Sequence, residues 1–89
     1  MAHSLSSKKR IRQNLRRRAL NRARKRSVHL KIRAFDDALT AQDEPKAAET
    51  LKVAIKQIDQ IAAKGTLHRN TAGRRKAKLQ RRYNALAAQ

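Results

Sequence analysis

The chain has 89 residues, of which 24 are Lys or Arg and 6 are Asp or Glu, so its formal net charge at pH 7 is +18. That length suits one small domain, residues 1–89, and so large a positive charge favours a polyanionic partner while it destabilises a compact fold. The chain has no Cys, which excludes disulfides and thiolate zinc sites, and no apolar run approaches the ~20 residues of a membrane-spanning helix.

The opening run from residue 6 to 26, SSKKRIRQNLRRRALNRARKR, holds eleven Lys or Arg and no Asp or Glu. From Ile11 onward it contains good helix formers and neither Gly nor Pro, which predicts a helix. Lys8, Lys9 and Arg10 fall in the first turn, at the positive end of the helix dipole, and no acidic i,i+4 partner follows. We therefore expect an arm that frays alone and becomes ordered against a polyanion.

A mitochondrial presequence is the alternative interpretation of this basic, acid-free start. The basic character resumes, however, between Arg69 and Arg82, where seven cations and no anion occur. The two aromatic residues, Phe35 and Tyr83, are too few to form a base-stacking platform. Charge is therefore expected to supply most of the affinity for a nucleic acid.

The first helix is expected over about residues 6–41, with Ser4, Ser6 and Ser7 each a plausible N-cap. Its second half carries two apolar stripes at helical spacing. One stripe comprises Val28, Ile32, Phe35 and Leu39, and the other comprises Leu20, Ala23, Ser27, Leu30, Ala34 and Ala38. A helix with two apolar stripes is expected to have two neighbours, whereas the half before Leu20 has too few apolar residues to be held by a bundle.

The second helix is expected over about residues 45–64. Asp43 or Glu44 can cap its start, and Pro45 suits its first turn because the missing N–H costs nothing there. Gly65 is expected to end it.

The third helix is expected over about residues 67–86, with Thr66 as its candidate N-cap. Gly73 lies inside this helix, where it costs roughly 1 kcal/mol relative to Ala. A close approach to a helix or to a phosphate would compensate for that cost.

Three helices joined by short turns predict an all-α, up-down-up three-helix bundle. The second and third helices are shorter than the first, so a long, basic N-terminal helix should project. Five of the six acids cluster around the first turn, and Arg81 and Arg82 on the third helix should return to that end. The acids are Asp36, Asp37, Asp43, Glu44 and Glu49. The opposite end and the arm should then face a nucleic acid.

No catalytic constellation or metal motif is present in the sequence, so neither an enzyme nor a metal or cofactor site is expected. His68 stands on an apolar stripe, where it is either a core or boundary histidine or a direct RNA contact. Asn14, Asn21 and Asn70 lie among cations and either bond sugar and phosphate oxygens or are simply solvated. The physics alone leaves both RNA and DNA open as the nucleic acid.

The opening HSLSSKKRIRQNLRRRALNRARKR, the turn AAKGTLHRN at residues 62–70 and the RRKAKL that starts at residue 74 resemble the ribosomal protein S20 family of the bacterial small subunit. The resemblance runs from end to end. Gly73 stands where that family usually has Ala, and Leu15 where a charged or polar residue is common.

The resemblance implies a three-helix bundle that is a monomer within the ribosome, in the cytoplasm of a bacterium or in an organelle. It implies direct binding of 16S ribosomal RNA and a role in assembly of the small ribosomal subunit, with no small-molecule substrate, no cofactor and no membrane. The RNA-binding residues expected are Lys8, Lys9, Arg10, Arg12, Asn14, Arg16, Arg17, Arg18, Asn21, Arg22, Arg24, Lys25 and Arg26 in the arm, and Lys64, His68, Arg69, Asn70, Arg74, Arg75 and Lys76 around the second turn. The alternatives are a nucleoid-type basic DNA-binding protein and a scaffold for an acidic protein partner.

Overall fold

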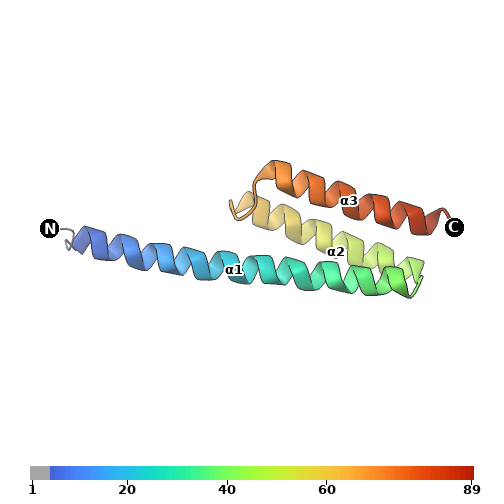
Figure 1. The fold of residues 1–89 in the computed structure, drawn as a ribbon, viewed down its shortest axis with the longest axis horizontal. Helices are drawn as coiled ribbons and strands as arrows, with labels where there is room; N and C mark the ends of the chain where they lie inside the picture. The colour runs from blue at the N-terminus through green and yellow to red at the C-terminus, as the bar shows by residue number, and fades with distance from the viewer. Residues whose placement is uncertain (1–4) are drawn as a thin grey trace.

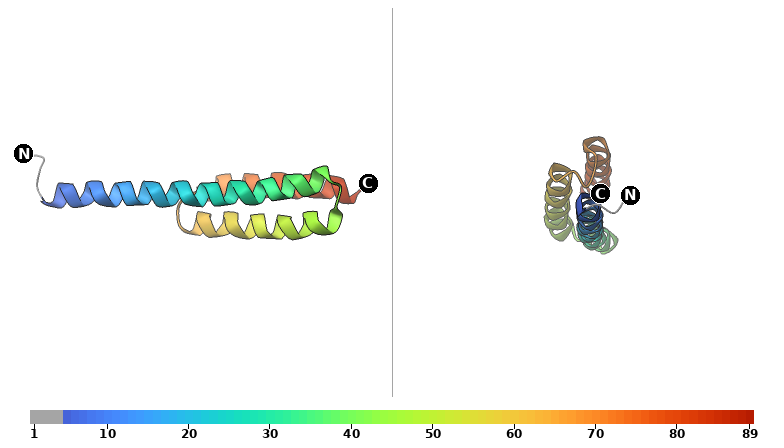
Figure 2. Two further views of the ribbon diagram at one scale, coloured as in Figure 1. Left: turned by 90° about the horizontal axis from the view of Figure 1, so that it is seen from below. Right: turned by 90° about the vertical axis from the view of Figure 1, so that its left-hand side faces the viewer.

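The computed structural model describes residues 5–89, which form three helices and no strand. The helices are α1 (Leu5–Thr40), α2 (Glu44–Ala63) and α3 (Arg69–Ala87), which confirms the predicted all-α fold with a long first helix (Figure 1). α2 and α3 lie beside only the C-terminal half of α1, and its N-terminal half projects (Figures 1 and 2). The molecule is therefore elongated, with extents of 65, 21 and 14 Å.

The start of α1 differs from the expected capping pattern. Ser6 and Ser7 already lie inside the helix, so neither is its N-cap. The third candidate, Ser4, lies outside the described residues. The first turn of α1 holds no acidic residue, so its dipole faces Lys8 and Lys9 without a compensating carboxylate.

The turn between α1 and α2 begins with a residue in the left-handed region. Gln42 has φ of 54°, and its N–H donates to the Leu39 carbonyl at 3.0 Å. Asp43 then caps α2 as predicted, because its carboxylate accepts from the Lys46 N–H at 3.2 Å. This cap fixes where the chain reverses, and so where α2 meets α1.

α2 ends at Ala63 with Lys64 as its C-cap, and Gly65 follows in the left-handed region, as expected, with φ of 79°. The Gly65 N–H donates to the Ala62 carbonyl at 3.0 Å and the Thr66 N–H to the Ile61 carbonyl at 2.9 Å, which is a Schellman arrangement. The predicted cap of the third helix is wrong. His68 caps α3 in place of Thr66, and the helix begins at Arg69, two residues later than expected.

The core is built around α2, which packs against both α1 and α3, whereas α1 and α3 make few contacts with each other. α2 contributes Ala47, Leu51, Ala54, Ile58 and Ile61, and the rest of the buried core comprises Val28, Phe35, Ala38, Leu67, Ala72 and Leu79. The first predicted stripe of α1 is confirmed. The second is wrong apart from Ala38, since Leu20 and Leu30 are 46% and 54% exposed. α1 has one principal neighbour where two were expected, so its second stripe has nothing to pack against.

The acidic end of the bundle holds α3 to α1. Arg82 Nη1 lies 2.6 Å from Asp36 Oδ1, and the Arg82 guanidinium carbon lies 5.8 Å from the centroid of the fully buried Phe35 ring. Arg82 thus returns to the acidic end, as predicted, and pairs with Asp36 there, whereas Arg81 makes no ion pair among residues 5–89. The pair is partly exposed, so its net contribution to stability is small, about 0 to 1 kcal/mol, and much of the benefit of Arg82 comes from covering the ring.

The two glycines make a matched pair for a stability test. A Cβ at Gly73 meets nothing within 4 Å, which excludes a close approach of another helix at this position. Gly73→Ala should therefore raise the free energy of unfolding by roughly 1 kcal/mol, because Ala is the better helix former. Gly65→Ala should lower it by about 1–2 kcal/mol, because an L side chain is strained at positive φ. Urea unfolding followed by circular dichroism measures both, and a destabilised Gly73→Ala protein would contradict the helical packing described here.

Candidate nucleic-acid interface

The projecting half of α1 is a polycation that the rest of the fold does not cover. Every residue from 8 to 20 is exposed, and the first buried residue of α1 is Val28. None of the eleven Lys and Arg side chains between residues 8 and 26 forms an ion pair within the described part of the chain. At about 100° per residue these cations lie on every side of the helix, with no gap wider than about 60°.

The arm joins the bundle through a small hydrogen-bond network. The Thr66 hydroxyl donates to Asn21 Oδ1 at 2.8 Å, and the half-buried Arg24 donates to Thr66 Oγ1 at 3.3 Å and to Asn21 Oδ1 at 3.4 Å. We call this network the arm root. It ties α1 to the turn between α2 and α3, so the direction of the arm is fixed relative to that turn.

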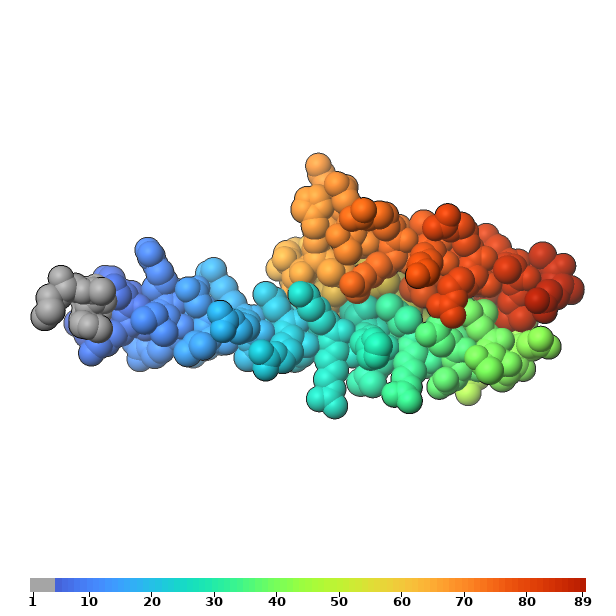
Figure 3. All heavy atoms as spheres, viewed as in Figure 1, coloured from blue at the N-terminus to red at the C-terminus, as the bar shows by residue number. Residues whose placement is uncertain are grey.

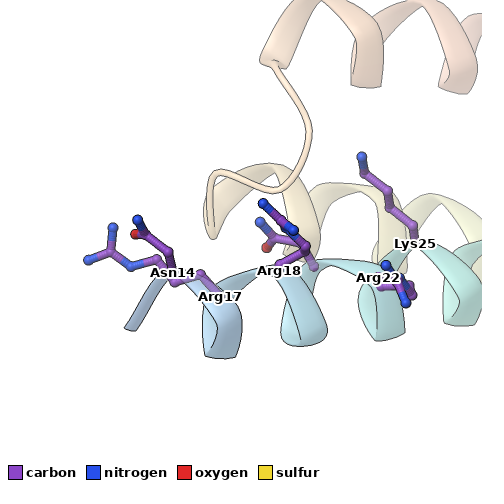
Figure 4. Close-up of a pocket in the computed structure, with 6 residues that line it drawn as sticks. Asn14, Arg17, Arg18, Arg22 and Lys25 are labelled. Atoms are coloured by element: carbon purple, nitrogen blue, oxygen red, sulfur yellow. The ribbon is translucent and has the colours of Figure 1, made fainter. Parts of the chain in front are cut away.

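Beside the arm root lies an open hollow of about 580 Å³. It is lined by one face of α1, namely Asn14, Arg17, Arg18, Asn21, Arg22 and Lys25. Figure 4 shows Arg18 and Lys25 directed toward the side on which the second turn lies, and Figure 3 shows the surface hollowed between the arm and the start of α3. Four cations and two amide side chains therefore line one side of an open space that can accept the backbone of a nucleic acid strand.

The second turn adds donors at the same end of the bundle. Lys64, His68, Arg69 and Asn70 are all exposed. His68 is not a core histidine, because its Nδ1 accepts from the Asn70 N–H at 3.1 Å as the cap of α3. With Nδ1 used as an acceptor, the neutral ring carries its proton on Nε2, which remains a hydrogen-bond donor.

The next predicted residues point in different directions because they are consecutive in α3. Arg74 and Arg75 are exposed, whereas Lys76 is half-buried and lies 2.7 Å from Asp59. Lys76 therefore already forms an ion pair with a carboxylate. Of the three, Arg74 and Arg75 keep the larger capacity for a new anionic contact.

Two chemical features are absent from the part of the chain that is described. Residues 5–89 contain no group of three or more His, Asp or Glu side chains arranged to hold a metal ion. None of the three helices is apolar over enough of its length to cross a membrane.

Thr66 is the residue whose role the sequence did not reveal. The sequence predicts that Thr66 caps α3. Instead, its hydroxyl donates to Asn21 Oδ1 and so joins α1 to the second turn in the arm root. The two residues are 45 positions apart, and no local pattern links them. The one available signal was a hydroxyl residue placed directly after the helix-ending Gly65.

The comparisons with known proteins agree on one family. The family model described as ribosomal protein S20 matches residues 2–84. A small ribosomal subunit protein bS20 from Syntrophobacter fumaroxidans is 44% identical over 86 residues, which cover 97% of this chain and 100% of the relative. The protein of the same name from Clostridioides difficile is 42% identical over 88 residues, which cover 99% of this chain and 100% of the relative.

The arm root can be tested by removing one hydroxyl group. Thr66→Val should lower the free energy of unfolding by about 1 kcal/mol, because Asn21 and Arg24 both lose a hydrogen-bond partner in a half-buried site. Thr40→Val is the matched control, since that exposed hydroxyl donates to the backbone carbonyl of Asp36 in its own helix. Thermal unfolding by circular dichroism checks both proteins, and equal midpoints for Thr66→Val and Thr40→Val would show that the network contributes nothing.

Proposed function

Because the chain belongs to the ribosomal protein S20 family, we propose that it is a structural constituent of the small ribosomal subunit that binds 16S ribosomal RNA directly. The family is one of ribosomal structural proteins and not of enzymes. The protein supports subunit assembly in the bacterial cytoplasm by neutralising phosphates of several RNA segments. It does so as a monomer, since a net charge of +18 opposes self-association.

The observation that supports this proposal best is the distribution of charge around the arm. A protein that lies on one flat RNA surface needs cations on one face only. The eleven cations of the arm are distributed around the whole helix, and none of them forms an ion pair among residues 5–89. Full neutralisation therefore requires phosphates on several sides of the arm, as occurs where RNA helices converge.

The shape of RNA supports contact with backbones over base reading. Duplex RNA has a deep, narrow major groove, which an α-helix of about 10–12 Å diameter does not enter. Arg and Lys side chains then act mainly on phosphate oxygens, which sets position more than sequence preference. Recognition on this basis depends on the three-dimensional arrangement of the RNA segments.

The bundle contributes a second contact surface in this proposal. Lys64, His68, Arg69 and Asn70 lie at the end from which the arm projects, with Arg74 and Arg75 further along α3. The arm root fixes the relation between these residues and the hollow beside α1. The protein therefore holds one RNA strand in the hollow and others along the arm.

The contribution of the arm can be measured from the dependence of RNA affinity on salt. Replacing Arg16, Arg17 and Arg18 together with Gln should reduce the slope of log affinity against log salt by about 2 to 3, because each phosphate contact contributes about 0.7–0.9 to that slope. Filter binding to deproteinised small-subunit RNA between 50 and 200 mM salt provides the measurement. The thermal midpoint should not change, since all three residues are exposed.

The matched control removes three charges from the bundle. Lys46, Lys52 and Lys56 are exposed on α2, away from the arm. Their triple replacement with Gln should leave the slope close to that of the unmodified protein. Equal slopes for the two triple variants would mean that net charge, and not the arm, determines binding.

The order of the arm in the absence of RNA stays a prediction, although α1 is a continuous helix from Leu5 to Thr40. Neighbouring cations repel one another, and residues 8–20 are all exposed, so their amides should exchange with deuterium much faster than those of residues 28–38. Addition of small-subunit RNA should slow exchange in the arm. Strong protection of the arm in the free protein would contradict the view that RNA supplies its order.

A further inference from the structure

The arm carries an apolar strip in addition to its cations. Ile11, Leu15 and Ala19 follow one another at four-residue intervals and so lie along one side of α1. Ile11 is 59% exposed and Leu15 is 57% exposed. A shallow hollow of about 430 Å³, lined by Leu5, Lys8, Ile11 and Arg12, extends this apolar surface toward the tip of the arm.

The strip faces away from the bundle. Twenty residues separate Leu15 from Phe35, which is fully buried against the rest of the core. At ~100° per residue this separation amounts to about 200° beyond whole turns, so the two side chains leave opposite sides of the helix. Neither α2 nor α3 can therefore cover the strip, and only a partner can.

Cations frame the strip on all sides. Arg12 and Arg18 lie about 60° to either side of Leu15, and Lys8 and Arg22 lie close to its line at the two ends. No acid occurs before Asp36, so the whole setting is electropositive. A second copy of this chain carries the same charge and is repelled, and an RNA matches both the charge and the position of the strip within the proposed interface.

We propose that this strip seats in the minor groove of an RNA duplex, with the flanking arginines on the two phosphate backbones. The proposal rests on the proposed function and specifies which RNA feature the far side of the arm recognises. The RNA minor groove is wide and shallow enough to receive a helix surface, and it presents ribose C–H groups and 2′-hydroxyls between two backbones. An unpaired base would instead be held by aromatic stacking, and both aromatic residues of the chain, Phe35 and Tyr83, lie in the bundle.

Binding by the strip should add affinity that salt does not remove. Ile11→Gln combined with Leu15→Gln places a good helix former at both positions and removes the apolar surface. Its affinity for deproteinised small-subunit RNA should fall about tenfold or more, with an unchanged salt slope, because apolar burial is lost and no phosphate contact is lost. The control is Leu30→Gln combined with Val53→Gln, which changes two similarly exposed residues in the bundle. This variant should bind the RNA as tightly as the unmodified protein does. A loss no larger than that of the control would overturn the proposal.

The position of the strip on the RNA can be read directly. The chain has no Cys, so Leu15→Cys creates a single attachment point for an iron chelate that generates hydroxyl radicals. Cleavage from this position should fall on both strands of one RNA helix, paired across its minor groove. Gln13→Cys, a neutral replacement on the opposite side of the arm, should cleave different nucleotides.

The outcomes separate the two proposals. Cleavage from position 15 confined to unpaired nucleotides, or absent while binding persists, would overturn the minor-groove assignment and leave the proposed function intact. Failure of the unmodified protein to bind the RNA at all would overturn both.

Discussion

Repulsion between like charges is the constraint on which the rest of this structure depends. The first acid along the chain is Asp36, so the arm has no internal counter-charge, and most of the acids gather at the far end of the bundle. There they serve the fold: Asp43 caps α2, and Asp36 receives Arg82 from α3. The molecule therefore divides into an end that is neutralised by its own residues and an end that is not.

A small core is sufficient because α2 does most of the packing. Five of the eleven buried core residues come from that helix, and α1 and α3 lie against it with little mutual contact. α1 buries Val28, Phe35 and Ala38 and packs Ile32 and Leu39 beside them, all in its second half, so its first half takes no part in the core. Leu30 of α1 stays exposed, and Val53 of α2 lies exposed in a shallow groove between α1 and α2.

The sequence predicted most of the fold because helix formers, turn residues and apolar spacing agree along the chain. Local sequence determines the helix-ending Gly65, the Asp43 cap and the stripe from Val28 to Leu39, so these features could be predicted without a structure. The features that could not be predicted depend on contacts between residues distant in the sequence. The exposure of the Leu20 to Ala34 stripe follows from the central place of α2, and the role of Thr66 follows from Asn21 lying beside it. The RNA-binding residues were predicted from charge alone. Charge does not distinguish Lys76, which forms an ion pair with Asp59, from the exposed Arg74 and Arg75.

α1 continues from the arm into the bundle without a Gly, a Pro or any other interruption from Leu5 to Thr40. A helix of this kind keeps a constant rise of ~1.5 Å per residue, so Lys8 and Arg24 are set about 24 Å apart along its axis. It works as a ruler, since whatever is held at the tip and at the root must respect that spacing. Removing a single residue between them would shorten the ruler only slightly but would rotate everything beyond it by about 100°, so the phase of the helix is constrained far more tightly than its length.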